Sequence, residues 1–179
     1  MQRTSAHDPS IAYDEGSRLY YVFGSHMATA KTRDLQNWTG VSFPWGMVNT
    51  DGTITSDVAP ADAFHTHQTR KITIHGETVD FGNFDAAAWN CALPGTGTNG
   101  EETPWTVDGN MWAPDIIYNP VLGKWCQYLS LNGPQWNSCI ILLTADRIEG
   151  PYVYQVLLYS ADSAATRTNA SPSTRPIWN

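Results

Sequence analysis

The chain has 179 residues, of which 41% are apolar and 15% are charged, and its net charge is −7. This length fits one domain. The chain is acidic and has no run of Lys and Arg, so binding to the phosphates of a nucleic acid is not expected. No segment approaches 18 consecutive apolar residues, so no membrane span is expected, and residues 1–6 lack the apolar core of a signal peptide.

Aromatic residues make up 12% of the chain, including eight Trp and eight Tyr. Clefts that bind sugars need such flat rings, because the C–H faces of a sugar stack on them. Large rings also dominate the burial of apolar area in protein cores. We therefore expect most of these rings in the core and a few in a cleft.

Cysteine spacing argues against a zinc site. Cys91, Cys126 and Cys139 form no C-x-x-C pair. One disulfide with one remaining thiol fits this spacing, and so do three buried thiols.

The first part of the chain predicts short strands separated by turns. Gly tolerates a positive φ and Asp and Ser bond their own backbone, so Asp14-Glu15-Gly16-Ser17 predicts a turn. Aromatic and β-branched runs on either side predict strands. The strands are expected at Ser10–Tyr13, Leu19–Phe23, Ala28–Thr32 and Trp38–Val41.

Residues 42–110 read differently, because Gly, Pro, Asn, Asp and Thr recur every few residues. Long loops of this kind are usually functional or disordered, so we interpret the segment as an insertion. Its one expected hairpin joins Arg70–Ile74 to Thr78–Phe81. This segment also contains His65, His67 and His75. No further metal ligand is evident, so we expect these histidines to be exposed and no metal site to be present.

Strand patterns return in residues 111–159, before a polar tail. The expected strands are Ile116–Tyr118, Trp125–Leu131, Cys139–Thr144 and Tyr152–Tyr159. The segment Ser160–Asn179 is rich in Ser, Ala, Thr and Asn and cannot bury enough apolar area to order itself, so disorder is expected.

An internal repeat links the two strand-rich parts. Residues 8–14 match residues 113–119, residues 18–23 match 124–129, and residues 30–35 match 144–148. Four short strands per copy suit a blade of a β-propeller, although a generic β-meander also fits. Two blades cannot close a ring, so either the propeller is incomplete or it pairs with something.

The repeat also isolates one carboxylate. Asp8 stands where the second copy has Ala113, at the start of a predicted innermost strand, and Pro9 fixes the backbone beside it. A residue that breaks the repeat at this place is a candidate for function at the propeller axis. An Asp that caps a turn is the structural alternative.

Three sequence blocks resemble glycoside hydrolase family 43, with the arabinanase-type members as the nearest likeness. The first is HDPS at residues 7–10 with Ile11, the second is FGSH at residues 23–26, and the third is WAPD at residues 112–115. Together they form a fairly specific set, and the likeness covers residues 7–41 and 111–159.

The resemblance implies an all-β fold, namely about two blades of a five-bladed β-propeller. Residues 1–159 would form this incomplete domain, with blade one at about 7–41, the insertion at 42–110 and blade two at about 111–159. Residues 160–179 would form the disordered tail.

The resemblance also implies an inverting glycoside hydrolase that acts on arabinose- or xylose-containing plant polysaccharide. Such an enzyme is expected outside the cell or in the periplasm. Its general base carries over to Asp8, and an inverting enzyme places a second carboxyl about 6.5–9.5 Å from the base to admit a water. The family's second aspartate and its acidic glutamate have no counterpart here. Asp115 aligns with Ser10, and Glu149 lies in an outer-strand turn, so neither is expected to replace them.

Five residues are expected to bind the sugar. They are His26, Trp112, Asp115, Asn132 and Trp136. Each has a structural alternative. For His26 it is a packing histidine, and for Trp112 it is a ring in the core. For Asp115 it is a strand-opening role, and for Asn132 and Trp136 it is a plain hairpin turn.

Other functions stay open at this stage. A carbohydrate-binding propeller would keep the aromatic cleft without hydrolysis. A related five-bladed enzyme acting on fructans also opens with an Asp base, but the FGSH and WAPD blocks argue against it. No cofactor is expected, this segment does not indicate a structural calcium at the axis, and the sequence does not specify an oligomeric state.

Overall fold

The computed structural model describes residues 3–49, 51–64, 71–74, 77–80, 85–91, 93–97, 99–107, 111–134 and 138–160. Of the expected disordered tail at 160–179, Ser160 is instead the last residue of a strand, and residues 161–179 lie outside the described residues. The same holds for His65, His67, His75 and Trp136. No helix in the described part has the length and apolar character needed to cross a bilayer.

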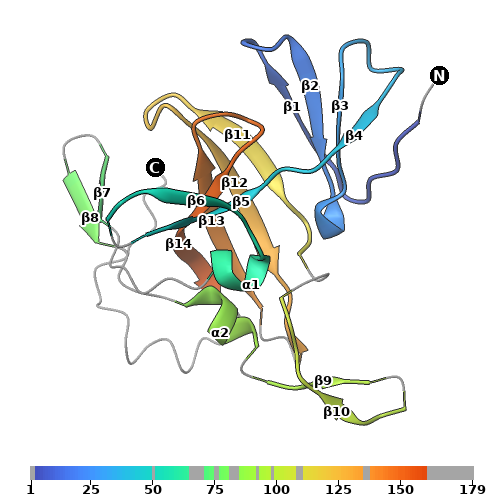
Figure 1. Cartoon of the computed structure of the whole chain (residues 1–179), viewed down its shortest axis with the longest axis vertical. Coiled ribbons are helices and arrows are strands. Elements are labelled where there is room, and N and C mark those ends of the chain that lie inside the picture. The colour runs from blue at the N-terminus through green and yellow to red at the C-terminus, as the bar shows by residue number, and fades with distance from the viewer. Residues whose placement is uncertain are drawn as a thin grey trace.

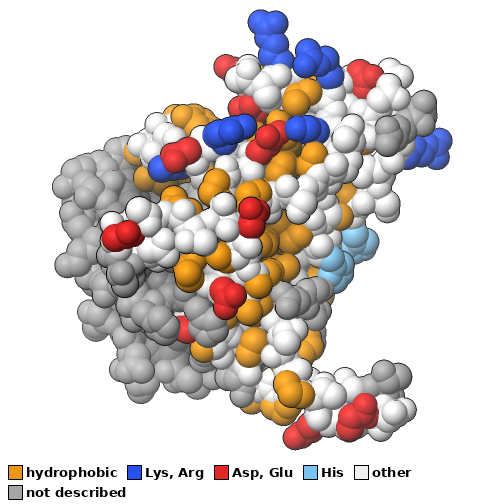
Figure 2. All heavy atoms as spheres, viewed as in Figure 1, with side chains coloured by type: hydrophobic (Ala, Val, Ile, Leu, Met, Phe, Trp, Pro, Cys, Tyr) orange, Lys and Arg blue, Asp and Glu red, His pale blue; other side chains and the backbone are white. Residues whose placement is uncertain are grey.

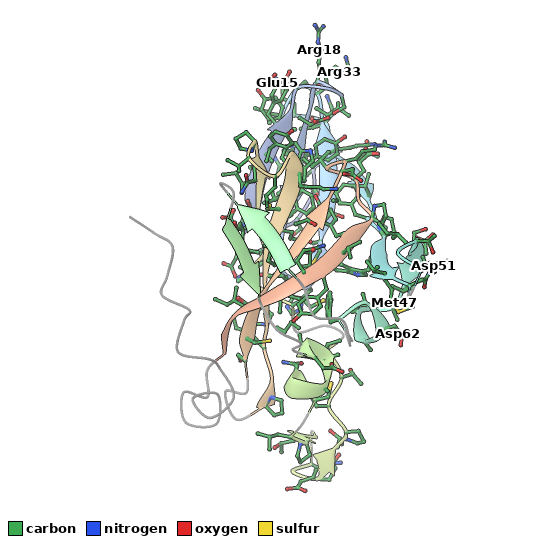
Figure 3. All side chains as sticks on the ribbon, turned by 90° about the vertical axis from the view of Figure 1, so that its left-hand side faces the viewer. Glu15, Arg18, Arg33, Met47, Asp51 and Asp62 are labelled. Carbon is green, nitrogen blue, oxygen red and sulfur yellow. The ribbon has the colours of Figure 1, made fainter. Side chains whose placement is uncertain are left out.

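The first sheet is a four-stranded antiparallel meander in the order β1-β2-β3-β4 (Figure 1). Its strands are β1 (Ser10–Asp14), β2 (Leu19–Phe23), β3 (Thr29–Thr32) and β4 (Thr39–Val41). The expected strands are confirmed to within a residue or two. Arg18, in the β1–β2 turn, and Arg33, in the β3–β4 turn, lie at the same tip, as antiparallel pairing requires (Figure 3).

The second sheet has six strands in the order β11-β12-β13-β14-β5-β6. The four expected strands are present with slightly wider bounds: β11 (Asp115–Asn119), β12 (Lys124–Leu131), β13 (Cys139–Ala145) and β14 (Tyr152–Ser160). The three pairings among these four strands are antiparallel. The fold is therefore mostly β, and its two larger sheets, in which most strand pairs are antiparallel, stand side by side (Figure 1).

The two remaining strands come from residues 42–110, where the sequence predicted only one hairpin, which is a correction. β5 (Trp45–Val48) pairs parallel with β14 through Tyr152↔Trp45 and Val153↔Gly46. β6 (Ile54–Val58) pairs antiparallel with β5 and forms the edge of the sheet. The expected hairpin is confirmed as β7 (Lys71–Ile74) and β8 (Glu77–Asp80). The same segment also contains β9 (Gly95–Thr96), β10 (Glu102–Thr103) and the short helices α1 (Pro60–Ala63) and α2 (Ala86–Asn90).

The core lies between the two sheets. Tyr21 and Phe23 of β2 pack in one cluster with Leu129 of β12 and Leu143 of β13, and all four side chains are buried. Phe23 also meets Tyr152 edge to face at 6.2 Å between ring centroids. These apolar contacts position the sheets against each other, since burial of such side chains is the main driving force of folding.

The internal repeat is real, but its register differs from the sequence match. Ser10 pairs with Phe23, and Asp115 pairs with Tyr128 in the same way. Position 23 is therefore equivalent to 128, not to 129, so the second strands are displaced by one residue from the sequence alignment. The third strands are displaced by one as well, because Tyr20 pairs with Thr32 while Trp125 pairs with Ala145.

All three cysteines carry thiols, so the disulfide alternative is wrong. Cys126 and Cys139 are buried and Cys91 is half-buried. Burial raises the pKa of the Cys139 thiol to about 12. Loss of solvation disfavours a thiolate, so Cys139 is a packing residue rather than a nucleophile.

Candidate functional site

Asp8 stands immediately before β1, with a left-handed backbone at φ 47°. Its side chain is 47% exposed, and Oδ2 lies 2.7 Å from His7 Nδ1. Ser25 Oγ donates to the same oxygen at 3.3 Å. The carboxylate is therefore oriented by two neighbours and still open to solvent.

The turn after β2 is built to meet Asp8. Ser25 N donates to His7 O at 2.8 Å, which closes the turn against the segment that precedes β1. A Cβ on Gly24 would approach Ala6 Cβ to 2.9 Å and His7 O to 3.1 Å. Only glycine allows this approach without a shift of the backbone, which explains its place directly before Ser25.

His26 links this turn to the segment before β11. It is exposed and has φ 56°, and its backbone N donates to Met111 O at 2.9 Å. The exposed ring of Trp112 follows directly in the chain. Figure 2 shows the described histidines side by side on one side of the molecule.

Trp112 and Asn132 are held together through the backbone. Trp112 N donates to Ser130 O at 3.1 Å, and Asn132 Nδ2 donates to Trp112 O at 2.5 Å. The side chain of Asn132 therefore fixes the chain at Trp112, which leaves the indole ring available for a ligand.

Asp115 connects the innermost strands of the two sheets. Ser10 Oγ donates to Asp115 Oδ1 at 2.7 Å and accepts from Ile116 N at 3.1 Å. Ser10 thus joins β1 to β11 at the place where both strands begin. This bonding supports the strand-opening role for Asp115.

The structure brings five of the six predicted site residues to one end of the two sheets. These are Asp8, His26, Trp112, Asp115 and Asn132, while Trp136 lies outside the described residues. Sequence reasoning missed the roles of Ser25 and Ser10, which bond the two aspartates. The signal for Ser25 was its place between Gly24 and His26, directly after a strand.

Glu149 lies at the opposite end, in the β13–β14 turn. Its Oε1 accepts from Lys31 Nζ at 2.7 Å and from the Tyr21 hydroxyl at 2.9 Å. The hydrogen bond from Lys31 holds the pKa of Glu149 below its usual value. A carboxyl that acts as a general acid needs a raised pKa, so Glu149 does not fit that role.

A cavity of about 430 Å³ also lies at this far end. It is lined by the β1–β2 turn, by Tyr21 and Trp125, and by the β13–β14 turn with Glu149. A cavity of this size is a candidate binding site. It lies away from Asp8, however, and the carboxylate that lines it, Glu149, is already bonded to Lys31 and Tyr21. We therefore place the candidate site at the Asp8 end. Among the described residues, no three His, Cys, Asp or Glu side chains gather to hold a metal ion.

Comparisons with known proteins agree with this architecture. No protein-family model matches the chain. The sequence is 23% identical over 173 residues to the extracellular endo-α-(1→5)-L-arabinanase 2 of Bacillus subtilis strain 168. The match covers 96% of this chain, which spans 28% of that relative's length.

Solved structures share the fold over the same limited extent. A mutant α-L-arabinanase of Cellvibrio cellulosa superposes with a TM-score of 0.50 at 15% identity, over 90% of this chain and 37% of that one. A glycoside hydrolase family 43 protein of Bacillus licheniformis gives a TM-score of 0.48 at 25% identity, over 89% of this chain and 27% of that one. The chain thus has the fold of one part of a larger β-propeller.

Proposed function

We propose that this chain, which has the fold of part of a glycoside hydrolase family 43 propeller, contributes the general base of an inverting glycoside hydrolase. The substrate class that we propose is arabinose- or xylose-containing plant polysaccharide, and the arabinanase relative from Bacillus subtilis supports the arabinose branch. That relative is named as extracellular, which supports an extracellular or periplasmic location.

One observation carries the proposal: an oriented, solvent-accessible carboxylate lies at the same end of the two sheets as an exposed indole. Ser25 and His7 hold Asp8, and the His26–Met111 hydrogen bond ties this turn to the segment that presents Trp112. A general base must accept a proton from water in the right direction, and a sugar ring must stack nearby. Both requirements meet at this end of β1 and β11.

The proposed reaction needs a second carboxyl as the acid. Asp115 accepts from Ser10, and Glu149 is held by Lys31 at the far end, so neither serves. Inner strands of separate blades converge on one axis in a propeller, so we expect the acid to come from another blade. The proposed division remains blade one at 7–41, the segment 42–110 and blade two at 111–159.

The test is an assay of the chain on arabinan and on aryl arabinosides. We expect no turnover, and we expect arabino-oligosaccharides to shift the NMR signals of His26 and of the Trp112 indole. Trp112→Ala should abolish that binding, whereas Leu35→Ala, at an exposed position in the turn after β3, should leave it unchanged. Absence of any sugar binding would contradict the placement of the site.

Turnover by the chain, lost in Asp8→Asn, would support the base and contradict the need for a further blade. In a longer product of the same gene that hydrolyses arabinan, Asp8→Asn should lower kcat about 10²–10⁴-fold, as expected for removal of general base catalysis.

The second candidate is a carbohydrate-binding propeller without hydrolysis. The bonding of Asp115 and Glu149 favours it, because each carboxylate is occupied by a structural partner. The reading frame beyond Asn179 discriminates between the two candidates. An Ile-Asp-Pro strand and a later Glu-x-Pro strand would favour the enzyme, and their absence would favour the binding protein.

A further inference from the structure

A short hairpin projects beyond the end of the second sheet, and we call this hairpin, β9 and β10 together with Trp105, the arm. Its strands pair antiparallel through Glu102↔Thr96 and Thr103↔Gly95 and form a sheet of their own, so the arm lies outside both large sheets. The arm stands out from the rest of the molecule in Figure 1, and Figure 2 shows it on the same flank as the described histidines.

Hydrogen bonds in the turn between β9 and β10 hold the arm in one conformation. Gly97 N donates to Glu101 O at 2.6 Å, and Gly100 N donates to Gly97 O at 3.0 Å. Asn99 N donates to the Glu101 carboxylate at 3.0 Å. Because these bonds order the arm before any ligand arrives, little conformational entropy is lost when one binds.

Trp105 fixes the arm to the body of the molecule. Its Nε1 donates to Asn90 Oδ1 at 2.9 Å, and Asn90 is fully buried at the end of α2. A Cβ on Gly95 would approach Trp105 Cε3 to 2.8 Å, so the ring lies against a position where only glycine fits. The indole is thus held in one orientation, and because it is only half-buried, part of its ring remains accessible.

The face of the arm around Trp105 has the chemistry that a neutral sugar requires. Thr103 is exposed and pairs with Gly95 across the arm, so its hydroxyl and the indole share one face. The C–H face of a sugar stacks on such a ring, and its hydroxyls bond to polar groups beside it. Residues 93–107 contain no Lys or Arg, whereas Glu101 and Glu102 are acidic, so an acidic sugar would be repelled.

The arm lies close to the segment that presents Trp112. Val107, just after Trp105, is buried in the same core cluster as Met111, and Met111 O accepts from His26 N. Trp112 follows Trp105 by seven positions in the sequence, so the two backbones are at most about 25 Å apart. An extended oligosaccharide of several units spans such a distance.

We propose that the face of the arm formed by Trp105 and Thr103 is a second sugar-binding platform, which takes a neutral pentose unit of the same polysaccharide away from Trp112. This inference rests on the proposed function, because the arm extends the site that contains Asp8 and Trp112. Two platforms that bind one sugar chain hold it more tightly than either does alone. The arm therefore favours polymers and long oligosaccharides over short ones.

NMR titration of the indole N–H signals tests the proposal in the wild-type chain. We expect a long arabino-oligosaccharide to shift the signals of both Trp105 and Trp112 with one midpoint, because a single sugar chain occupies both platforms. An oligogalacturonide, which carries a negative charge on each unit, should leave the Trp105 signal unchanged.

Two substitutions of Trp105 separate stacking from anchoring. Trp105→Phe and Trp105→Leu both remove the hydrogen bond to Asn90, but only Phe keeps an aromatic ring. We expect Trp105→Leu to weaken binding of the long arabino-oligosaccharide about tenfold and Trp105→Phe to retain most of the affinity. Trp38→Leu, at a half-buried Trp in the β3–β4 turn, should bind like the wild type.

The outcomes separate this inference from the proposed function. A Trp105 signal that stays unchanged while Trp112 shifts would overturn the platform and leave the proposed function intact. A shift of Trp105 alone would support the platform and contradict the sugar site at Trp112, and no shift of either indole would overturn both. Equal losses in Trp105→Phe and Trp105→Leu would reduce Trp105 to an anchor of the arm and overturn its stacking role. Equal shifts with the oligogalacturonide would overturn the assignment to neutral sugars.

Discussion

Glu149 shows how one side chain joins the two sheets. Its carboxylate accepts hydrogen bonds from Lys31 on β3 and Tyr21 on β2, while its own backbone lies in the turn that follows β13. The bond to Lys31 lowers the pKa of Glu149, and the bond to Glu149 raises the pKa of Lys31. The pair therefore stabilises the folded chain in the pH range where both groups are charged.

We predict that Glu149→Gln lowers the free energy of unfolding at neutral pH by about 1 kcal/mol, since it removes charge from partly buried hydrogen bonds. A group whose folded pKa is lowered stabilises above its unfolded pKa, and that stabilisation disappears as the pH falls through the folded pKa. The difference between wild type and Glu149→Gln should thus fade below pH 4.5, the usual value for Glu. Urea unfolding at a series of pH values measures it.

The matched control is Asp146→Asn. Asp146 pairs with Lys124 in the same turn region, but its side chain is largely exposed. Its effect on unfolding should be smaller than that of Glu149→Gln. Equal effects of the two variants, or a difference that grows in acid, would contradict a stabilising role for the Glu149 carboxylate.

At the scale of elements, α1 anchors the β5–β6 pair to the core. Phe64, at the end of α1, is fully buried and its ring lies 5.2 Å from that of Trp45 on β5, edge to face. Phe64→Ala should lower the free energy of unfolding by about 3–5 kcal/mol, because it leaves a cavity in addition to the lost burial.

Chemical denaturation at constant pH checks this value, with Leu35→Ala as the control. Leu35 is an exposed apolar residue in a turn, so its truncation should change stability by less than about 0.5 kcal/mol. A loss below about 1 kcal/mol for Phe64→Ala would mean that the segment from β5 to α1 is not part of the cooperative core.

The strands inside residues 42–110 show the limit of local pattern reading. β5 contains Gly46, and β6 is almost wholly exposed, so neither has the alternation that predicts a strand. β5 forms because β14, far downstream, offers a parallel partner and Tyr152 N donates to Pro44 O at 3.0 Å. A Cβ on Gly46 would approach Val153 Cγ2 to 3.0 Å, so the glycine serves close packing.

The repeat alignment failed for a related reason. Alignment of the apolar residues in the two repeats matched Tyr20 with Cys126. The strand pairing instead makes Tyr20 equivalent to Trp125. A shift of one residue moves every side chain to the other face of a sheet. Register is decided by which face meets a neighbouring sheet, and that information is not local.

At the scale of the whole molecule, Gln127 is a polar side chain buried within the apolar packing between the two sheets. It lies on the same face of the second sheet as Ile116 and Leu143 of the core cluster and is fully buried. Both polar atoms of its side chain lack a hydrogen-bond partner within the described structure. An unsatisfied buried amide costs about 1–3 kcal/mol, so Gln127→Met should raise the free energy of unfolding by about 1 kcal/mol.

Thermal and urea unfolding of Gln127→Met against Gln155→Met provide the measurement. Gln155 is half-buried and its amide donates to Val153 O at 3.2 Å, so its replacement should not stabilise. If Gln127→Met destabilises instead, the amide has a role in joining the sheets that its surroundings do not reveal.

The sequence by itself determined the antiparallel strands, the two-fold repeat and the singular position of Asp8. These follow from side-chain alternation, turn residues and a motif read over a few neighbouring positions. Only the tertiary structure decided that Ser10 joins Asp115, that Glu149 bonds Lys31 and Tyr21, and that β5 pairs with β14. Each of these contacts joins residues far apart in the chain, and their partners are chosen by the packing of whole sheets, which no local stretch of sequence encodes.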